Sequence, residues 1–379
     1  MTDRPLDGIT VVSLEQAVAA PFATRQLADL GARVIKIERD TGDFARGYDT
    51  AVSGMASYFV WLNRSKESVV LDLKSEYGLA ALRRLIASAD VVVQNLAPGA
   101  VDRLGVGAEA CLRANPALVY TSISGYGTGG PYEDKKAYDL LIQCEAGLLS
   151  VTGTPDVPSK VGISIADIAA GMYAYSGTLA ALLKRSRTGV GQHIEVSMLE
   201  SLGEWMGNPY FYTEYGGHAP GRTGASHPTI APYGPFDCSD GVVFMAIQNE
   251  REWLRFCAQV IELPELERDT RFSDNAHRVR YRGELESTIR PILTKLSRAD
   301  VIDRLDSASI ANAMLRTMED FSAHPQLEAR GRWRQVDSPV GPLRTLIPPV
   351  TGDWEPRMER VPGLGDDTTR VLAEFHKDI

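Results

Sequence analysis

Short apolar runs separated by helix-like segments are the feature of this sequence that most restricts its fold. Four runs have the length of buried strands: Ile9–Leu14, Val34–Glu38, Val91–Val93 and Ala117–Ser124. Between two of them, leucine and isoleucine recur at helical spacing around residues 79–86. Strands that alternate with helices at short intervals favour βαβ units and a parallel sheet. The sequence therefore predicts an α/β fold.

A long apolar segment follows these units, at residues 161–201. It predicts the end of a strand that runs into a helix of small and apolar residues. Lys184 and Arg185 suit the last turn of this helix, and the glycines of TGVGQ end it. The next six residues, HIEVSM, alternate as a strand does.

The composition changes near residue 217, where glycine, proline, serine and histidine become frequent. We expect a linker or active-site loop over 217–241 and a smaller α+β domain over 242–330. The proline-rich tail then returns, and a last helix is expected over Asp366–Lys377. The large α/β domain is thus predicted to be discontinuous, with residues 1–216 and 331–379.

The charge and cysteine content narrow the class of protein. The chain has 40 Lys and Arg against 49 Asp and Glu, a net charge of −9, which argues against nucleic acid or an anionic membrane as partner. No stretch is apolar enough to span a membrane, and the first residues lack a signal core. The four cysteines have no metal-ligand spacing, and no HExxH motif occurs. We expect a cytoplasmic protein without a metal.

The glycine-rich segment GYGTGG, residues 125–130, matches the dinucleotide fingerprint letter for letter. That fingerprint binds a pyrophosphate only where a helix opens directly after it. Here Pro131 and a charged stretch follow instead. The pattern indicates a glycine loop over a site, or an ordinary turn, and we expect no nucleotide redox cofactor.

Asp167 stands at the start of the long helix among alanines and a glycine. Two interpretations remain open from the residues alone. The carboxylate caps the helix or faces its dipole, or it is a nucleophile that small neighbours leave open to a substrate. The preceding GISIA lacks the last glycine of a serine-hydrolase elbow and indicates strand-end packing.

Several basic residues lie near the ends of predicted strands, and each alone is ordinary surface charge. Arg39 and Arg103 follow strand-plus-turn segments, at the edge of a parallel sheet where α/β proteins bind ligands. Together they form a candidate phosphate clamp.

A series of motifs resembles the class III CoA-transferases, a family that includes formyl-CoA transferase, carnitine CoA-transferase and acyl-CoA racemases. In order along the chain they are LDGI, LADLGARVIKIER, LDLKS, VVVQNLAPGAVDRLG, SISGYG, ADIAAG and TGVGQHIEVSMLES. The resemblance covers nearly the whole chain. It implies a Rossmann-like large domain that binds coenzyme A, and an interlocked homodimer. The substrates it implies are an acyl-CoA and small carboxylic acids.

The resemblance also implies roles for single residues. Asp167 matches the family nucleophile, which forms aspartyl anhydride and aspartyl-CoA thioester intermediates. Tyr48 and Tyr138 match aromatic positions near the reacting acyl group. The implied CoA-binding positions are Val18, Ala19, Arg39, Leu71, Asn95, Arg103, Leu104 and Lys136.

The chain departs from the family pattern in three places. Formyl-CoA transferase has a glutamine where Val18 stands, and its tetraglycine loop is replaced here by Arg222–Tyr233. Arg222 and His227 in that loop suit a carboxylate on the acyl chain, so we expect C4–C5 dicarboxylates with succinyl-CoA as donor. The racemases have a histidine base where Tyr138 stands, and tyrosine titrates near ~10. Tyrosine is thus a poor base at neutral pH, which counts against racemisation; a racemase or epimerase of the same family is the alternative.

Overall fold

The computed structural model describes residues 4–375 and divides into two compact units. The first unit comprises Met1–Gly147, Val161–Gly207 and Leu327–Ile379, and the second comprises Leu148–Lys160 and Asn208–Gln326. The first unit is therefore discontinuous. The segment 148–160, which the sequence analysis placed in the large domain, belongs to the second unit. The domain limits proposed from the sequence otherwise stay a prediction.

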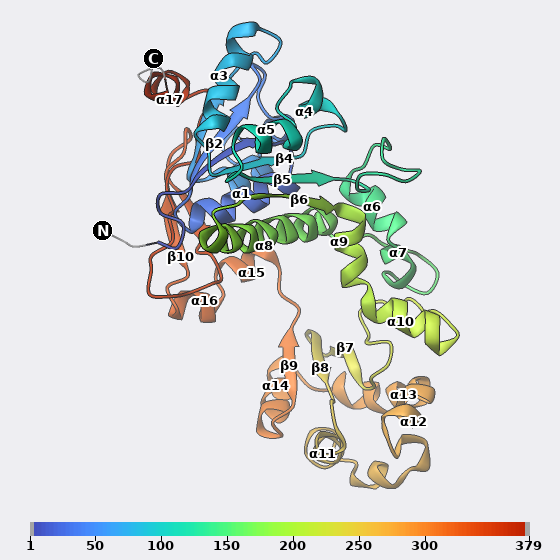
Figure 1. Cartoon of the computed structure of the whole chain (residues 1–379). Helices are drawn as coiled ribbons and strands as arrows, with labels where there is room; N and C mark the ends of the chain where they lie inside the picture. The colour runs from blue at the N-terminus through green and yellow to red at the C-terminus, as the bar shows by residue number, and fades with distance from the viewer. Residues whose placement is uncertain (1–3, 376–379) are drawn as a thin grey trace. The chain divides into compact units, whose positions relative to one another are not determined.

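A six-stranded parallel sheet forms the centre of the first unit, in the order β3-β2-β1-β4-β5-β6 (Figure 1). This is the strand order of doubly wound nucleotide-binding folds, so the predicted α/β class is confirmed. The strands are β1 Thr10–Leu14, β2 Arg33–Glu38, β3 Lys66–Val70, β4 Val91–Gln94, β5 Val119–Ser124 and β6 Gln192–Ser197.

Helices cover both faces of this sheet. Successive residues of a strand point to opposite faces, so each strand contributes side chains to both layers of helices. On β5, the hydroxyl of Tyr120 donates to Val106, on the side where α3, α5 and α17 pack. The next residue, Thr121, is 2.8 Å from Thr178 of α8 between the two hydroxyl oxygens. Helices α1 and α8 pack together on that second face (Figure 1).

The helices of the first unit begin and end at recognisable residues. Ser75 caps α3 by accepting from Gly78 N at 3.0 Å, and Gly189, with φ of 71°, ends α8. The bounds are α1 Ala19–Asp29, η1 Phe44–Gly47, α2 Ser57–Asn63, α3 Glu76–Ala87, α4 Ala100–Arg103, α5 Ala108–Ala114, α6 Asp139–Glu145, α8 Ile165–Thr188, α9 Met198–Trp205 and α17 Thr368–Glu374.

The C-terminal segment closes the first unit at strand β3, an edge of the sheet. The amide of Ser68 donates to Asp367 at 3.1 Å, and that of Val70 donates to Thr368 at 3.0 Å. Before this contact the segment forms a hairpin of β10 Trp333–Val336 and β11 Leu343–Leu346. The edge strand is thus paired with side chains nearly 300 residues later in the chain.

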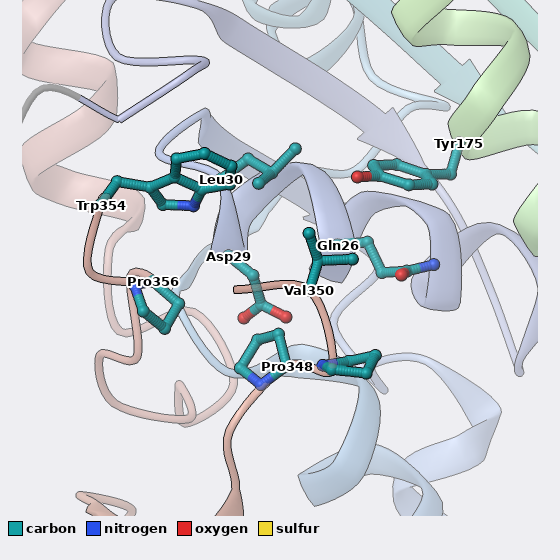
Figure 2. A pocket seen from close by; sticks show the side chains of 9 residues that line it. Gln26, Asp29, Leu30, Tyr175, Pro348, Val350, Trp354 and Pro356 are labelled. Atoms are coloured by element: carbon teal, nitrogen blue, oxygen red, sulfur yellow. The ribbon is translucent and has the colours of Figure 1, made fainter. Parts of the chain in front are cut away.

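The proline-rich return packs against α1 and leaves only a small pocket. Pro348, Trp354 and Pro356 face Asp29 and Gln26 of the helix (Figure 2). The cavity volume is about 20 Å³, which holds a single water. Asp29 is engaged by Arg25 and Arg64, both buried, so this contact is packing and not a substrate site.

The second unit is an antiparallel sheet with helices. Its three strands run in the order β7-β8-β9, and aromatic and aliphatic residues such as Trp253, Phe256 and Phe272 fill its core. The bounds are α7 Leu148–Val151, α10 Gly207–Gly216, β7 Tyr233–Cys238, β8 Gly241–Ala246, α11 Glu250–Arg255, η2 Phe256–Val260, η3 Pro264–Arg268, η4 Thr270–Phe272, α12 Asn275–Arg280, α13 Arg282–Leu293, α14 Arg298–Ser307, β9 Ala311–Met314 and α15 Met318–Ser322; α16, Pro325–Ala329, follows.

Four elements differ from the sequence-based expectations. The strand β3 was missed because Lys66, Glu67 and Ser68 make it look polar. No strand leads into α8, since the chain bends at residues 162–163. Strand β7 lies inside the segment expected to be linker, 217–241. The last helix ends at Glu374, and the predicted extension to Lys377 lies outside the described residues.

Within residues 4–375, no helix is long and apolar enough to cross a membrane. In the same described part of the chain, acidic, histidine and cysteine side chains form no cluster that would hold a metal ion.

Candidate active site

Asp167 lies in the first turn of α8, but a different residue caps this helix. The amides of Ala166 and Asp167 donate to Asp139 Oδ1, at 2.8 and 3.3 Å. Asp139 is fixed in turn by the amide group of Gln143, at 2.7 Å from Oδ2. Because Asp139 satisfies the free amides of the helix end, the carboxylate of Asp167 is not needed as a cap.

The carboxylate of Asp167 instead meets the start of another helix. The backbone N–H of Ala19, the first residue of α1, faces it and favours its charged form. The helices approach closely because Gly171, one turn after Asp167, has no side chain. A Cβ on Gly171 would stand 2.7 Å from the carbonyl oxygen of Ala19 and 3.0 Å from Cδ1 of Phe22.

The surroundings of Asp167 make its carboxylate hard to ionise. Burial raises its pKa most, the charge of Asp139 raises it further, and the hydrogen bond from Ala19 lowers it; the pKa of Asp167 is raised to about 7. Strongly shifted pKa values are frequent at functional sites, where the ionisable group takes part in the reaction. A destabilised carboxylate is a stronger nucleophile than a solvated one.

Tyr48 interacts electrostatically with both Asp167 and Tyr138. Burial, followed by the charges of Asp43 and Asp167, raises the pKa of Tyr48 to about 12, with a smaller contribution from Tyr138. Tyr48 therefore keeps its proton at neutral pH and is a hydrogen-bond donor. Its ring contacts Tyr58 with centroids 5.7 Å apart. Tyr48, Tyr138 and Asp167 thus lie near one another.

Four of the expected CoA-binding positions share one edge of the sheet. Val18, Arg39, Leu71 and Asn95 follow β1, β2, β3 and β4, respectively, within a few residues. Since these strands are parallel, their carboxyl ends meet at the same edge, where open α/β sheets bind ligands. Arg103 and Leu104, at the end of α4, come after β4, and Lys136 comes after β5.

Some side chains at these positions are buried or hydrogen-bonded, and others are exposed. Val18 and Leu71 are buried. Asn95 accepts from the amide of Gln16 and donates to its carbonyl, at 2.8 and 2.9 Å. Arg39, Arg103 and Lys136 are exposed cations, and Nε of Arg39 donates to Gly42 at 3.0 Å.

The glycine loop, residues 125–130, leads into a segment in which Lys135 contacts two aromatic rings and a carboxylate. The ammonium of Lys135 lies 4.2 Å from the ring centre of Tyr132 and 5.3 Å from that of Tyr126, and it pairs with Glu145 at 2.5 Å. Helix α6 does not begin until Asp139, so no helix opens at the glycines. The segment is unlike a dinucleotide-binding turn, as the sequence indicated.

In the second unit, Arg222 and His227 are held by their own neighbourhood. Arg222 donates to the carbonyls of Thr154 and Pro155, at 2.9 and 2.7 Å. His227 stacks on Tyr233 with ring centres 5.1 Å apart. Nδ1 of His227 accepts from the amide of Thr229 at 3.2 Å, which leaves the proton of the neutral ring on Nε2.

Sequence reasoning missed Asp139 and two buried lysines, Lys36 and Lys66. Lys36 carried a usable signal, since a lysine inside the apolar strand VIKIE must find a buried carboxylate. Asp139 carried a weaker one, a carboxylate directly before the apolar LLI. That it caps α8 rather than its own helix is a long-range contact that local patterns do not contain.

Comparisons of the sequence and of the fold with known proteins identify the family of this chain. The model of CoA-transferase family III matches residues 6–368. A succinate–glutarate CoA-transferase from Agrobacterium fabrum is 34% identical over 399 aligned positions, which cover 99% of this chain and 98% of that protein. An acetyl-CoA:oxalate CoA-transferase from Acetobacter aceti is 36% identical over 86% of this chain and 84% of its own length.

Among solved structures, a CAIB/BAIF family protein from Brucella suis superimposes with a TM-score of 0.87. It is 34% identical, and the alignment covers 99% of this chain and all of that one. The strand order, the family match and the near-complete coverage lead to one conclusion: the chain belongs to CoA-transferase family III.

Proposed function

We propose that this enzyme moves CoA from succinyl-CoA to a C4–C5 dicarboxylic acid, with Asp167 as the nucleophile. The observation that carries the proposal is the place of Asp167, in the first turn of a helix that Asp139 caps and beside Gly171, which lets the start of α1 approach closely. Burial there raises the pKa of Asp167 to about 7. The name of the Agrobacterium fabrum relative, with succinate and glutarate, supports the choice of acids.

The reaction runs through covalent intermediates on Asp167. A carboxylate oxygen of Asp167 attacks the thioester carbonyl carbon and the C–S bond breaks. The CoA thiolate departs, and a mixed anhydride of succinate and Asp167 remains. The thiolate attacks the aspartyl carbonyl and releases succinate, which gives an aspartyl-CoA thioester. The acceptor carboxylate attacks the aspartyl carbonyl and displaces the thiolate, which gives a second mixed anhydride. The thiolate then attacks the acceptor carbonyl of this anhydride and releases Asp167. Each step exchanges acyl groups of similar reactivity, so no ATP is needed.

The backbone around Asp167 suits this sequence of steps. Every attack on a carbonyl places negative charge on an oxygen, and the N–H of Ala19 at the start of α1 is a donor aimed at that charge. The hydroxyl of Tyr48, which stays protonated, is a second donor next to the carboxylate.

CoA is proposed to lie along the carboxyl edge of the parallel sheet. The exposed cations Arg39, Arg103 and Lys136 contact its phosphates. The other contacts are backbone near Val18 and Ala19, and the neighbourhood of Leu71, Asn95 and Leu104. The family resemblance and the shared sheet edge support this placement.

The loop Arg222–Tyr233 is proposed to select the acceptor acid. Its Arg222 is a guanidinium that recognises a distal carboxylate, and His227 offers an N–H from Nε2. The relative named for oxalate binds a shorter acid, so chain length is the property that a screen must vary.

We also propose an interlocked homodimer, located in the cytoplasm. Large apolar side chains are exposed on the first unit and on α10, which is unusual for a monomer. The exposed fractions are 64% for Leu183, 45% for Trp205, 60% for Phe211 and 76% for Tyr215. Two threaded chains separate only on unfolding. Light scattering on dilution to nanomolar concentration is therefore expected to report twice 41.4 kDa throughout; a mass that falls toward the monomer would contradict the threading.

The decisive experiment compares two carboxylates. Asp167→Asn is expected to abolish CoA exchange between succinyl-CoA and glutarate, and hydroxylamine added during turnover is expected to modify Asp167 in the wild type. The control, Asp139→Asn, keeps an oxygen that accepts from Ala166 and is expected to stay active. Exchange by Asp167→Asn, or trapping at another residue, would refute the nucleophile. Deuterium entering the α-position without exchange would mark a racemase instead.

A further inference from the structure

The turn that precedes α1 has an unusual backbone. Ala17 has a φ of 61°, the left-handed region that L-residues other than glycine avoid. Two residues later comes Ala19, whose N–H reaches Asp167. Strained backbone of this kind persists only where the surrounding structure enforces it, and it gathers at functional sites. The question is therefore what holds this turn.

Two side chains hold the turn directly. Asn95 bonds both the amide and the carbonyl of Gln16. Asp43 Oδ1 accepts from the amide of Ala17 at 3.1 Å and from that of Ala45 at 2.9 Å. The backbone on the N-terminal side of the strained residue is thus fixed from two neighbouring strand ends.

Behind the turn lies a network of four charged side chains, Glu15, Lys36, Asp43 and Lys66, whose side chains are 0% exposed. Lys36 Nζ is 2.9 Å from Asp43 Oδ2 and 3.3 Å from Glu15 Oε1. Lys66 Nζ is 2.7 Å from the same Glu15 oxygen. Two ammonium groups balance two carboxylates, so the network is neutral.

This network also reaches the first turn of α1. Lys66 donates to the carbonyl of Pro21 at 3.1 Å, and Thr24 of the same helix donates to Glu15 Oε2 at 2.6 Å. Burial lowers the pKa of Lys66 to about 8, which means that its site disfavours the charged form of the amine. Buried ion pairs add little to stability compared with apolar packing, and stability therefore does not account for three of them at this place.

We infer that Lys66, with Glu15, Lys36, Asp43 and Asn95, is a positioning device that fixes the Ala17 turn and so aims the Ala19 N–H at Asp167. The inference rests on the proposed role of Asp167. Lys66, Glu15, Lys36 and Asp43 do not touch the substrate in this scheme, and Asn95 acts on the turn through its two bonds to Gln16. They act through the backbone of the turn and of the first turn of α1.

The test is a charge-neutral double substitution, Lys66→Met with Glu15→Gln, which removes the bond to Pro21 without leaving a lone buried charge. Misplacing a catalytic group by a fraction of an ångström is expected to lower kcat on the order of tenfold or more. A weakened Ala19 bond is also expected to move the ionisation of Asp167, seen in the pH profile of kcat/KM, upward by about one pH unit. The other groups that face Asp167, namely Asp139, Tyr48 and Tyr138, are unchanged in this variant.

A matched control is Arg64→Met. Arg64 is also a buried cation bonded to α1, but it binds Asp29 at the far end of the helix. It is expected to lower stability while the pH profile stays that of the wild type. An equal shift in this control would overturn the inference, because general destabilisation would then explain it.

A second variant, Asn95→Ala, introduces no buried charge and tests the turn if the double substitution does not fold. Positioning predicts a lower kcat and the same upward shift of the pH profile of kcat/KM as in the double substitution. A raised KM with an unmoved pH profile would overturn the inference and leave Asn95 as a CoA contact. Hydroxylamine trapping at Asp167 in each variant separates this result from failure of the nucleophile itself.

Discussion

Replacing Gly171 by alanine tests the close contact of α1 and α8 most directly. The added Cβ would stand 2.7 Å from the carbonyl oxygen of Ala19, while ordinary contacts of a Cβ begin at 3.4 Å. The start of α1 must therefore move by about 0.7 Å, and the Ala19 N–H moves with it. A displacement approaching 1 Å at a catalytic group costs up to about 100-fold in rate. We expect kcat to fall by a factor between about 10 and 100.

Stability is expected to change much less than rate. Alanine is favoured over glycine in a helix interior by about 1 kcal/mol, and overpacking costs about 1–3 kcal/mol. The free energy of unfolding should therefore fall by no more than about 2 kcal/mol. The measurements are kcat for succinyl-CoA and glutarate, the pH profile of kcat/KM, and denaturant unfolding of the same preparation.

The same helix offers a matched control in Gly177→Ala. Its Cβ would meet only a side-chain methyl, Cγ2 of Ile194, at 3.1 Å. A methyl group can turn aside where a backbone carbonyl cannot, so this variant is expected to keep wild-type kcat. If Gly171→Ala also keeps kcat within about twofold of the wild type, a difference of under 1 kcal/mol, the argument from close approach is wrong.

Three further predictions follow from charge and contact. Because the pKa of Asp167 is about 7 in the folded chain and 3.8 when unperturbed, its ionised form destabilises the fold; Asp167→Asn should therefore raise the unfolding temperature at pH 8 but not at pH 4, with the gain developing between those two pKa values. An equal gain at both pH values would show that ionisation is not the cause. Arg103→Ala should weaken CoA binding in calorimetry, and wild-type affinity should fall with added salt; no change in either would remove the phosphate clamp. Arg222→Ala should raise the KM for dicarboxylic acceptors with CoA binding unchanged; equal effects on monocarboxylic acids would make the loop structural.

The sequence predicted those parts of the fold that depend on local pattern. β1, β2, β4, β5 and β6 are apolar or alternating runs, and each was found within a residue or two of its bounds. Strand β3 was missed because its polar residues are satisfied by partners far along the chain. Lys66 pairs with Glu15, and Ser68 donates to Glu38 at 2.6 Å. Periodicity describes which face is apolar, but it carries no information on such partners.

The candidate site shows the same division. Asp167 was singled out from small neighbours and a resemblance, yet its two local interpretations could not be separated. In the structure Asp139 occupies the cap, which excludes capping by Asp167, and the role of Asp167 as nucleophile stays a proposal. Likewise, no glycine marks the strained Ala17 turn in the sequence. The contacts that enforce this turn come from Asp43 and Asn95, in the segments that follow β2 and β4.

The edge of the sheet at β3 has a consequence for synthesis of the chain. The amides of Ser68 and Val70 bond side chains of Asp367 and Thr368, which are translated nearly 300 residues later. Until then the nascent first unit presents an unpaired strand edge, a surface on which growing chains associate wrongly. A premature stop shortly before Asp367 would therefore yield a product with nearly every helix and strand, but one prone to form aggregates rather than a weaker enzyme.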